Sequence, residues 1–251
     1  MIAESIAKSS QKVIPYITAG LPDLETTGQI VDAIARAGAP AIEIGIPFSD
    51  PTADGPVLQE ASHLALKAGF TMDALFSRLS EWCSSSPIPI IVMTYINPLL
   101  RKGMRKTLRR FKDCGISGII IPDLPRDASG VYNLCSSRGL ALIRLLAPTT
   151  KRERAKEILG QCSGFVYAVS VAGVTGPRDD LPDGLESQVR FIRGLANIPV
   201  CVGFGVSRKS QVDRILKIAD GVIVGSYLVK GIMHSHDPVN AVTSAYQDLV
   251  A

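Results

Sequence analysis

Two carboxylates in one short stretch are the first candidates for chemistry, because the run EIGIPFSDPTADGP begins with Glu43 and contains Asp54. Glu43 lies in an otherwise apolar segment, which predicts a buried strand. An ionised carboxylate there is costly unless it is paired or its pKa rises. Glu43 is therefore a candidate acid or base. The alternative interpretation is a structural glutamate whose carboxylate is satisfied by a neighbouring residue.

Asp54 follows in a segment that carries three prolines, so we expect it on a loop. It directly precedes Gly55 and Pro56, and it could simply be the N-cap of the next helix. Two carboxylates on a strand and on a loop can hold different pKa values, and hence different roles in proton transfer. Together they predict an acid-base site.

Three glycine-rich segments late in the chain predict an anion site. Backbone N–H groups at such turns, together with the start of a helix near Ser226, can bind phosphate. Ordinary tight turns are the alternative for each segment alone. The segments are VAGVTG (171–176), GFGVS (203–207) and GVIVGS (221–226).

Three aromatic residues, Tyr16, Tyr167 and Phe204, are expected in or just beyond strands, where their rings could line a flat apolar slot. Core packing is the default alternative for any one of them. The three histidines lack metal-ligand spacing with carboxylates or cysteines, so no metal is expected.

The elements that must position these residues alternate along the chain. Short runs rich in Val and Ile are separated by longer amphipathic stretches, which is the pattern of a parallel sheet covered by helices. Eight such units predict an α/β protein with a (β/α)8 barrel, whose chemistry lies at the carboxyl ends of the strands. An open doubly wound sheet is the structural alternative. The strands are expected to begin near Val13, Ala41, Ile88, Gly118, Ala141, Phe165, Pro199 and Gly221.

Helix boundaries are marked by capping residues and by glycines that allow the left-handed backbone at a helix end. No Pro/Gly/Ser-rich linker interrupts the pattern, so residues 1–251 are expected to form a single domain. The expected N-caps are Asp23, Thr71, Thr150 (in a capping box with Glu153) and Ser207, and the expected terminating glycines are Gly38, Gly115 and Gly139.

Composition limits the class of protein. Hydrophobic residues make up 46% and charged residues 20%, which is typical of a globular chain. The formal charge of +4 mildly favours an anionic substrate and does not indicate nucleic acid. Basic residues from 101 to 112 are expected on a solvated helix face.

Five cysteines without a CxxC pair argue against zinc and disulfides, so a reducing cytoplasm is expected, with a plastid as the other possibility. No signal peptide or membrane segment is recognised.

These motifs resemble, in order and over nearly the whole chain, the tryptophan synthase alpha family. The resemblance departs from the usual family pattern at Leu21, Thr52 and Ala172, of which the last two are expected in active-site loops. The matching segments are VIPYITAG from Val13, VMTYINPLL from Val92, GIIIPDLP from Gly118, LLAPTT from Leu145, GVTG from Gly173 and GVIVGS ending at Ser226.

The resemblance implies a retro-aldol cleavage of indole-3-glycerol phosphate to indole and glyceraldehyde 3-phosphate. Glu43 would protonate indole C3 and take the proton of the glycerol hydroxyl, and Asp54 would stabilise the positive indole nitrogen. The indole would lie among Tyr16, Ile120, Tyr167 and Phe204, and the phosphate would bind at Thr175, Gly176, Gly205, Gly225 and Ser226.

The resemblance also implies a beta subunit, in an α2β2 complex, that holds pyridoxal phosphate, while this chain needs no cofactor. The shared surface would include Asp50, Asn97, Pro122 and Asp123. Two other functions remain open from the sequence. One is a sugar-phosphate isomerase or epimerase, which would need a more polar pocket. The other is a barrel that has lost good catalysis and chiefly activates its partner.

Overall fold

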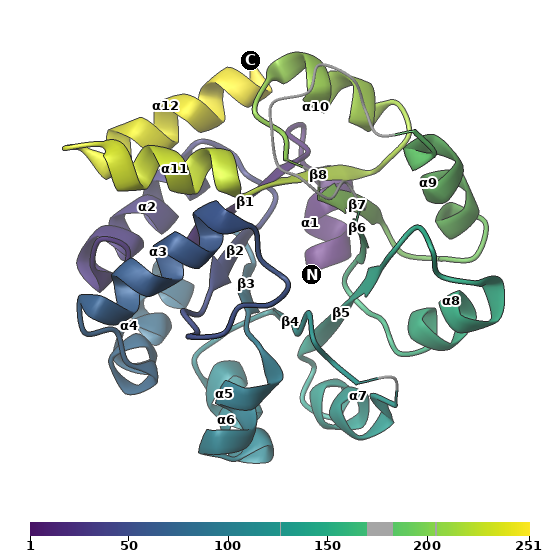
Figure 1. Ribbon diagram of the computed structural model, residues 1–251, viewed down its shortest axis with the longest axis horizontal. Helices are drawn as coiled ribbons and strands as arrows, with labels where there is room; N and C mark the ends of the chain where they lie inside the picture. The colour runs from purple at the N-terminus through teal and green to yellow at the C-terminus, as the bar shows by residue number, and fades with distance from the viewer. Residues whose placement is uncertain (126, 170–182, 204) are drawn as a thin grey trace.

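The computed structural model describes residues 1–125, 127–169, 183–203 and 205–251. Eight parallel strands form a closed barrel in chain order, and β1 pairs with β8 to complete the ring (Figure 1). The (β/α)8 prediction is confirmed, and the open sheet is excluded. The strands are β1 Val13–Thr18, β2 Ile42–Gly45, β3 Ile90–Met93, β4 Gly118–Ile120, β5 Ala141–Leu146, β6 Val166–Val169, β7 Val200–Gly203 and β8 Gly221–Val224.

The expected strand starts are correct for β1, β4, β5 and β8 and lie one or two residues early for the others. Pro199 explains why the strand start expected from the apolar pattern lies one residue before the observed start of β7. Proline has no N–H to donate, and its carbonyl accepts from Val166 before the strand begins at Val200.

Helices surround the strand ring, and most of them return the chain from one strand to the next (Figure 1). The helices before β5 are α1 Ile2–Lys8, α2 Leu24–Arg36, α3 Pro56–Lys67, α4 Met72–Ser85, α5 Ile96–Lys102, α6 Met104–Asp113 and α7 Ser129–Ser136. Those after β5 are α8 Arg152–Leu159, α9 Leu185–Arg193, α10 Lys209–Leu216, α11 Ser226–His234 and α12 Pro238–Val250.

Two expected N-caps are confirmed, because the side chains of Asp23 and Thr71 accept from backbone N–H groups of α2 and α4. The other two are wrong by one residue. The N-cap of α8 is Lys151, without a side-chain cap bond, and that of α10 is Arg208. Gln211 marks the observed start instead, since its Oε1 accepts from the N–H groups of residues 207 and 208 in a capping box with Arg208 as the N-cap.

The terminating glycines Gly38, Gly115 and Gly139 all have positive φ, as expected. The basic stretch from 101 to 112 differs from its prediction in one respect. It spans two helices, α5 and α6, because Gly103 between them adopts a φ of 84°. Its side chains nevertheless face solvent for the most part, and Lys102 and Arg110 both pair with Asp73.

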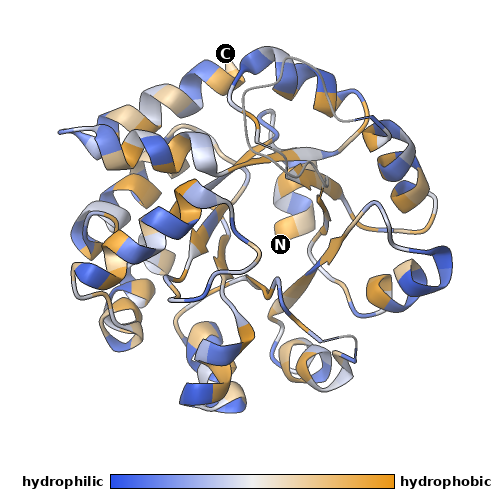
Figure 2. Cartoon of the chain, in the orientation of Figure 1, coloured by the Kyte–Doolittle hydropathy of each residue, from blue (hydrophilic) through white to orange (hydrophobic). Residues whose placement is uncertain are grey.

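The strands and the inner faces of the helices carry the hydrophobic residues (Figure 2). The barrel interior holds its own cluster, which includes Ile14, Ile91 and Ile120 and is separate from the layer between strands and helices. Helix α1 joins that inner cluster through Ile2 and Ile6, so it closes the amino end of the barrel. The carboxyl end remains as the place for a site.

Candidate active site

Glu43 lies in the middle of β2, paired with Tyr16 of β1 on one side and with Ile91 of β3 on the other. Its side chain is fully buried, and neither carboxylate oxygen has a hydrogen-bond partner among the described residues. Burial raises the pKa of Glu43 to about 8. The interpretation of Glu43 as a satisfied structural glutamate does not fit this environment. A group with this pKa is protonated at neutral pH and can donate a proton.

Asp54 lies on the loop between β2 and α3, and it is not the cap of that helix. Gly55 is the N-cap, with Pro56 in the first turn and no side-chain cap bond. Burial raises the pKa of Asp54 to about 6, and a hydrogen bond with Tyr95 opposes that rise. The carboxylate of Asp54 is therefore mostly ionised at neutral pH while Glu43 is mostly neutral. The two carboxyl groups hold the different protonation states that separate roles require.

Tyr16 is buried and Tyr167 is half-buried, and both lie beside these carboxylates at the carboxyl end of the barrel. Each ring lies against the glycine that ends an adjacent strand, since a Cβ on Gly45 would collide with Tyr16 and one on Gly203 with Tyr167. Burial raises the pKa of both phenols. Negative charge adds to this effect, chiefly from Asp54 at Tyr16 and from Glu43 at Tyr167. The structure thus brings the four predicted residues together.

Ile120 is fully buried in the inner cluster that Tyr167 also contacts, which agrees with a place at the bottom of an apolar slot. Phe204 lies outside the described residues, as do Thr175 and Gly176.

The remaining residues expected at the phosphate follow the adjacent strands β7 and β8. Gly205 is exposed, and a Cβ there would meet no atom within 4 Å. Gly225 is the N-cap of α11, and Ser226 is the first residue of that helix. Gly225 also borders the slot, because a Cβ there would lie 3.3 Å from Cδ1 of Tyr16. The described part of the expected cradle therefore adjoins the aromatic slot.

The four residues expected at a partner surface lie on loops or helix starts that follow β2, β3 and β4. Asp50 and Asn97 are exposed. Asp123 is exposed as well, and its Oδ1 accepts from the N–H of Ile96 at 2.9 Å, which links the loop after β4 to the start of α5. Pro122 precedes it and is half-buried. These residues occupy one arc of the carboxyl rim.

One residue near the carboxylates was not singled out from the sequence. Tyr95, the N-cap of α5, is 3% exposed, and its Oη accepts from the N–H of Ala53 at 2.9 Å. The only available signal was its place directly after a strand, where barrels hold their functional residues. Nothing in the local pattern shows that its hydroxyl reaches the loop of Asp54.

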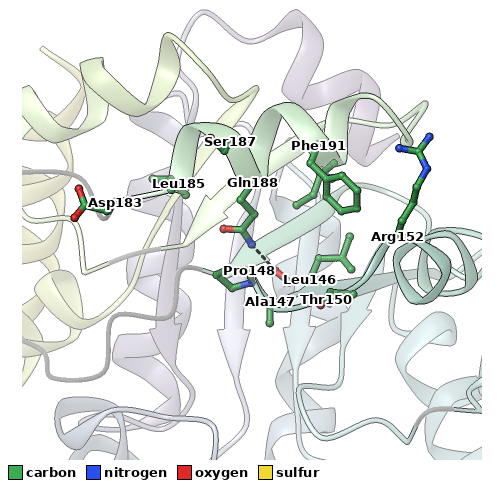
Figure 3. Close-up of a pocket in the computed structure, with 12 residues that line it drawn as sticks. Leu146, Ala147, Pro148, Thr150, Arg152, Asp183, Leu185, Ser187, Gln188 and Phe191 are labelled. Atoms are coloured by element: carbon green, nitrogen blue, oxygen red, sulfur yellow. Dashed lines mark hydrogen bonds between the residues drawn. The ribbon is translucent and has the colours of Figure 1, made fainter.

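A separate cavity of about 490 Å³ lies between α8 and α9 and contains none of the expected site residues (Figure 3). Gln188 forms its inner wall. The Nε2 group of Gln188 donates to the carbonyls of Leu146 and Val169, both at 3.1 Å, and thereby ties together the ends of β5 and β6. This cavity lies outside the strand ring, away from Glu43.

The three histidines are surface residues in this structure. His63, His234 and His236 are exposed on helices or loops, as expected. Across residues 1–125, 127–169, 183–203 and 205–251, no group of three His, Cys, Asp or Glu side chains could hold a metal ion. Within the same ranges, no helix is long and apolar enough to cross a membrane.

Comparison with known proteins supports a single family. The family model described as tryptophan synthase alpha chain matches residues 2–250. The tryptophan synthase alpha chain of Carboxydothermus hydrogenoformans is 42% identical over 92% of this chain and 86% of its own length. That of Methanocaldococcus jannaschii is 40% identical over 91% of this chain and 82% of its own.

Solved structures agree with these relatives. The tryptophan synthase A-subunit of Pyrococcus furiosus superposes with a TM-score of 0.90 at 38% identity, covering 96% of this chain and 98% of that one. A chain from the a2b2 complex of the same organism gives a TM-score of 0.91 at 39% identity, with the same coverage. With the fold, the buried glutamate and matches along nearly its whole length in agreement, this chain belongs to the tryptophan synthase alpha chain family.

Proposed function

We propose that this chain is the alpha subunit of a tryptophan synthase and that it cleaves indole-3-glycerol phosphate into indole and glyceraldehyde 3-phosphate. The observation that carries the proposal is Glu43, a buried carboxyl without a partner whose pKa of about 8 keeps it protonated beside two tyrosines. A carboxyl group in that state can donate to a carbon of an apolar ring and accept a proton once it has ionised.

In the proposed reaction Glu43 gives its proton to indole C3, which leaves a positive charge on the indole nitrogen. Asp54, ionised at neutral pH, stabilises that charge. The carboxylate of Glu43 then takes the proton of the glycerol C3′ hydroxyl as the bond between the ring and the glycerol chain breaks. The electron pair of that bond returns to the ring and neutralises the nitrogen, and the hydroxyl carbon becomes the aldehyde.

Substrate binding divides between two parts of the barrel. The indole ring lies between Tyr16 and Tyr167, with Ile120 beneath, and Phe204 completes the slot. The phosphate binds at the backbone of Gly205, Gly225 and Ser226, together with Thr175 and Gly176. The support for this division is the open space at residue 205 and the position of residue 225, where an added Cβ would meet the ring of Tyr16.

The same barrel could instead serve a sugar-phosphate isomerase, and the two tyrosine rings beside Glu43, one buried and one half-buried, argue against that reaction. The environment of Glu43 argues against a chain that only activates its partner. Burying a carboxyl group without a hydrogen-bond partner lowers stability, and a role in catalysis would account for that cost.

For the partner, we propose that a beta subunit binds at Asp50, Asn97, Pro122 and Asp123 in an α2β2 complex, and that it holds pyridoxal phosphate and consumes the indole. This chain would bind no cofactor of its own. A solved relative is described as an a2b2 complex with mutual activation. We further propose that residues 1–251 act as one domain and that the location is cytoplasmic, which five unpaired thiols favour.

The decisive experiment measures indole released from indole-3-glycerol phosphate by the wild-type chain and by Glu43→Gln, each with and without a beta subunit. The amide keeps the shape of the side chain but cannot transfer a proton, so kcat should fall by on the order of 10²–10⁴-fold while the circular dichroism spectrum is unchanged. If the variant kept more than about a tenth of wild-type kcat, Glu43 would not be the acid. If the wild-type chain were inactive both with and without the beta subunit, the result would favour a chain that only activates its partner.

A further inference from the structure

We propose that Tyr95 is a positioning residue for Asp54: its hydroxyl holds the loop between β2 and α3 in place and keeps the Asp54 carboxylate ionised at neutral pH. The inference rests on the catalytic role proposed above for Asp54. It assigns a function to a side chain that lies on the neighbouring β3–α5 connection.

The first step is geometric. The Oη atom of Tyr95 accepts a hydrogen bond from the N–H of Ala53 at 2.9 Å, across 42 residues of chain. The ring of Tyr95 also packs against Phe48 of the same loop, with 5.3 Å between ring centroids. The loop is therefore held at two points, near its start at residue 48 and directly before Asp54.

The second step follows from the chemistry of a phenol, which has one O–H to donate and lone pairs to accept. Because the N–H of Ala53 uses an acceptor position, the single O–H of Tyr95 remains for the carboxylate of Asp54. A donor to the charged form of a carboxyl group lowers its pKa. Tyr95 supplies that effect here, against the stronger opposite effect of burial.

The third step is the rigidity of Tyr95 itself. The residue before it donates its backbone N–H to the carbonyl of Ile120, and the residue after it donates to Asp123. Tyr95 is also 3% exposed. A hydroxyl carried on a backbone fixed on both sides can impose a position on the loop of Asp54, whose residues 48–55 are all exposed or half-exposed.

Other ionisable groups that face Asp54 do not replace this effect. Tyr16 of β1, Glu43 of β2 and Tyr167 of β6 lie close enough to interact with Asp54, with one another, or with both. Glu43 is neutral at pH 7, and the pKa of each of the two tyrosines is raised, so these groups carry no charge there. Asp123 faces Tyr95 from the β4 side and would, as an anion, disfavour an ionised phenol.

The test replaces the hydroxyl alone, with Tyr95→Phe, and uses Tyr132→Phe on α7 as the matched control. The hydroxyl of Tyr132 has no hydrogen bond among the described residues. The pKa of Asp54 is measured by ¹³C NMR titration of carboxyl-labelled aspartate, assigned by the signal missing from Asp54→Asn. The pH dependence of kcat and KM is measured in the αβ complex with indole-3-glycerol phosphate.

In Tyr95→Phe the pKa of Asp54 should rise above its value of about 6, and the acidic limb of kcat should move to higher pH by the same amount. Activity near pH 6 should then fall roughly threefold to tenfold further than activity near pH 8, with KM changed less than kcat. Tyr132→Phe should change none of these quantities. An unchanged Asp54 titration in Tyr95→Phe, or an equal loss of activity at every pH, would overturn the proposal.

A second variant separates the hydroxyl from the ring packing. Phe48→Leu removes the ring contact but keeps the hydrogen bonds, so the pKa of Asp54 should stay near its wild-type value. A pKa that rose in Phe48→Leu as much as in Tyr95→Phe would assign the effect to packing and contradict the proposal. If Asp54→Asn kept full activity, the catalytic role of Asp54 would fail, while the NMR titration would still decide whether Tyr95 controls its ionisation.

Discussion

At the scale of single residues, the candidate site contains a carboxyl group, Glu43, that no described neighbouring side chain stabilises in its ionised form. Among the described residues, Glu43 has neither a hydrogen-bond partner nor a cation beside it, and burial alone raises its pKa. Asp54 is only half-buried and has a phenol nearby, so its pKa rises less. The difference between the two pKa values arises from the greater burial of Glu43 and from the hydrogen bond of Tyr95 to Asp54, since both carboxyl groups lie near the same two tyrosines, Tyr16 and Tyr167.

The pH dependence of the reaction follows from these two values. The proposed roles require Asp54 ionised and Glu43 protonated in the free enzyme, so kcat/KM should be bell-shaped, with limbs near pH 6 and near pH 8. Asp54→Asn should lower the plateau and remove the acidic limb. Initial rates between about pH 5 and about pH 9 measure the profile. A basic limb that persisted in Glu43→Gln would belong to another group.

The buried glutamate should also cost stability at high pH. The unfolded chain ionises Glu43 near 4.5, whereas the folded chain holds its proton until about pH 8. The contribution of the protonated Glu43 side chain to the free energy of unfolding is therefore fully present below pH 4.5, decreases as the pH rises, and is lost above about pH 8. The Glu43→Gln variant has no such ionisation. Its free energy of unfolding minus that of the wild type should therefore increase by up to a few kcal/mol between pH 4.5 and about pH 8. Urea unfolding at both ends measures it, and parallel profiles would contradict it.

At the scale of elements, the strand ends assemble the site, and much of that assembly could be predicted from the sequence. Val/Ile runs that alternate with amphipathic stretches predicted the barrel, and the barrel placed Glu43, Tyr16 and Tyr167 at one end. Positive φ at glycines such as Gly38 was predictable, because few other residues adopt that backbone at a helix end.

What could not be predicted depends on contacts between distant residues. The reach of Tyr95 to Ala53 crosses 42 residues and leaves no local pattern. The start of α10 lies one residue later than expected, because the Oε1 of Gln211, in the first turn, accepts from the N–H groups of residues 207 and 208 and this reach across the turn leaves no serine signal in the sequence. The break at Gly103 was hidden by basic residues that continue with helical spacing on both sides of it.

The glycine after β7 offers the sharper test of the anion site. At Gly225 a side chain would also press on Tyr16, whereas at Gly205 it would enter open space. Gly205→Leu should therefore weaken binding of glycerol phosphate by about tenfold or more and leave indole binding nearly unchanged. Calorimetric titration with each ligand measures this, and Gly130→Leu on α7, where a Cβ also meets nothing, is the control. Equal weakening for both ligands, or none, would place the phosphate elsewhere.

At the scale of the whole molecule, the proposed partner surface and the loop of Asp54 share one arc of the rim. Asp50 and Asp54 lie on the same loop, and Tyr95 links that loop to the start of α5, where Asn97 is exposed. A partner that contacts this arc can stabilise the loop that carries Asp54 and so offset part of the entropy lost when it is ordered.

Coupling between partner and ligand must be reciprocal. Glycerol phosphate should tighten the association of this chain with a beta subunit by the same factor by which the beta subunit tightens glycerol phosphate binding. Titration with the beta subunit, with and without glycerol phosphate, measures both factors. Equal affinity in the two titrations would exclude the coupling, and no association at all would favour an enzyme that acts alone.

The position of Tyr16 has a consequence for which molecules this barrel can accept. Its ring lies between the glycine that ends β2 and the glycine that follows β8, and so between the strand of Glu43 and the anion site proposed after β8. Closed barrels keep the spacing of their strands fixed. The distance between the two carboxylates and the proposed anion site is therefore set by the barrel. A phosphate ester with a shorter chain between its ring and its phosphate can reach only one of the two, and only a molecule of matching length can bind at both.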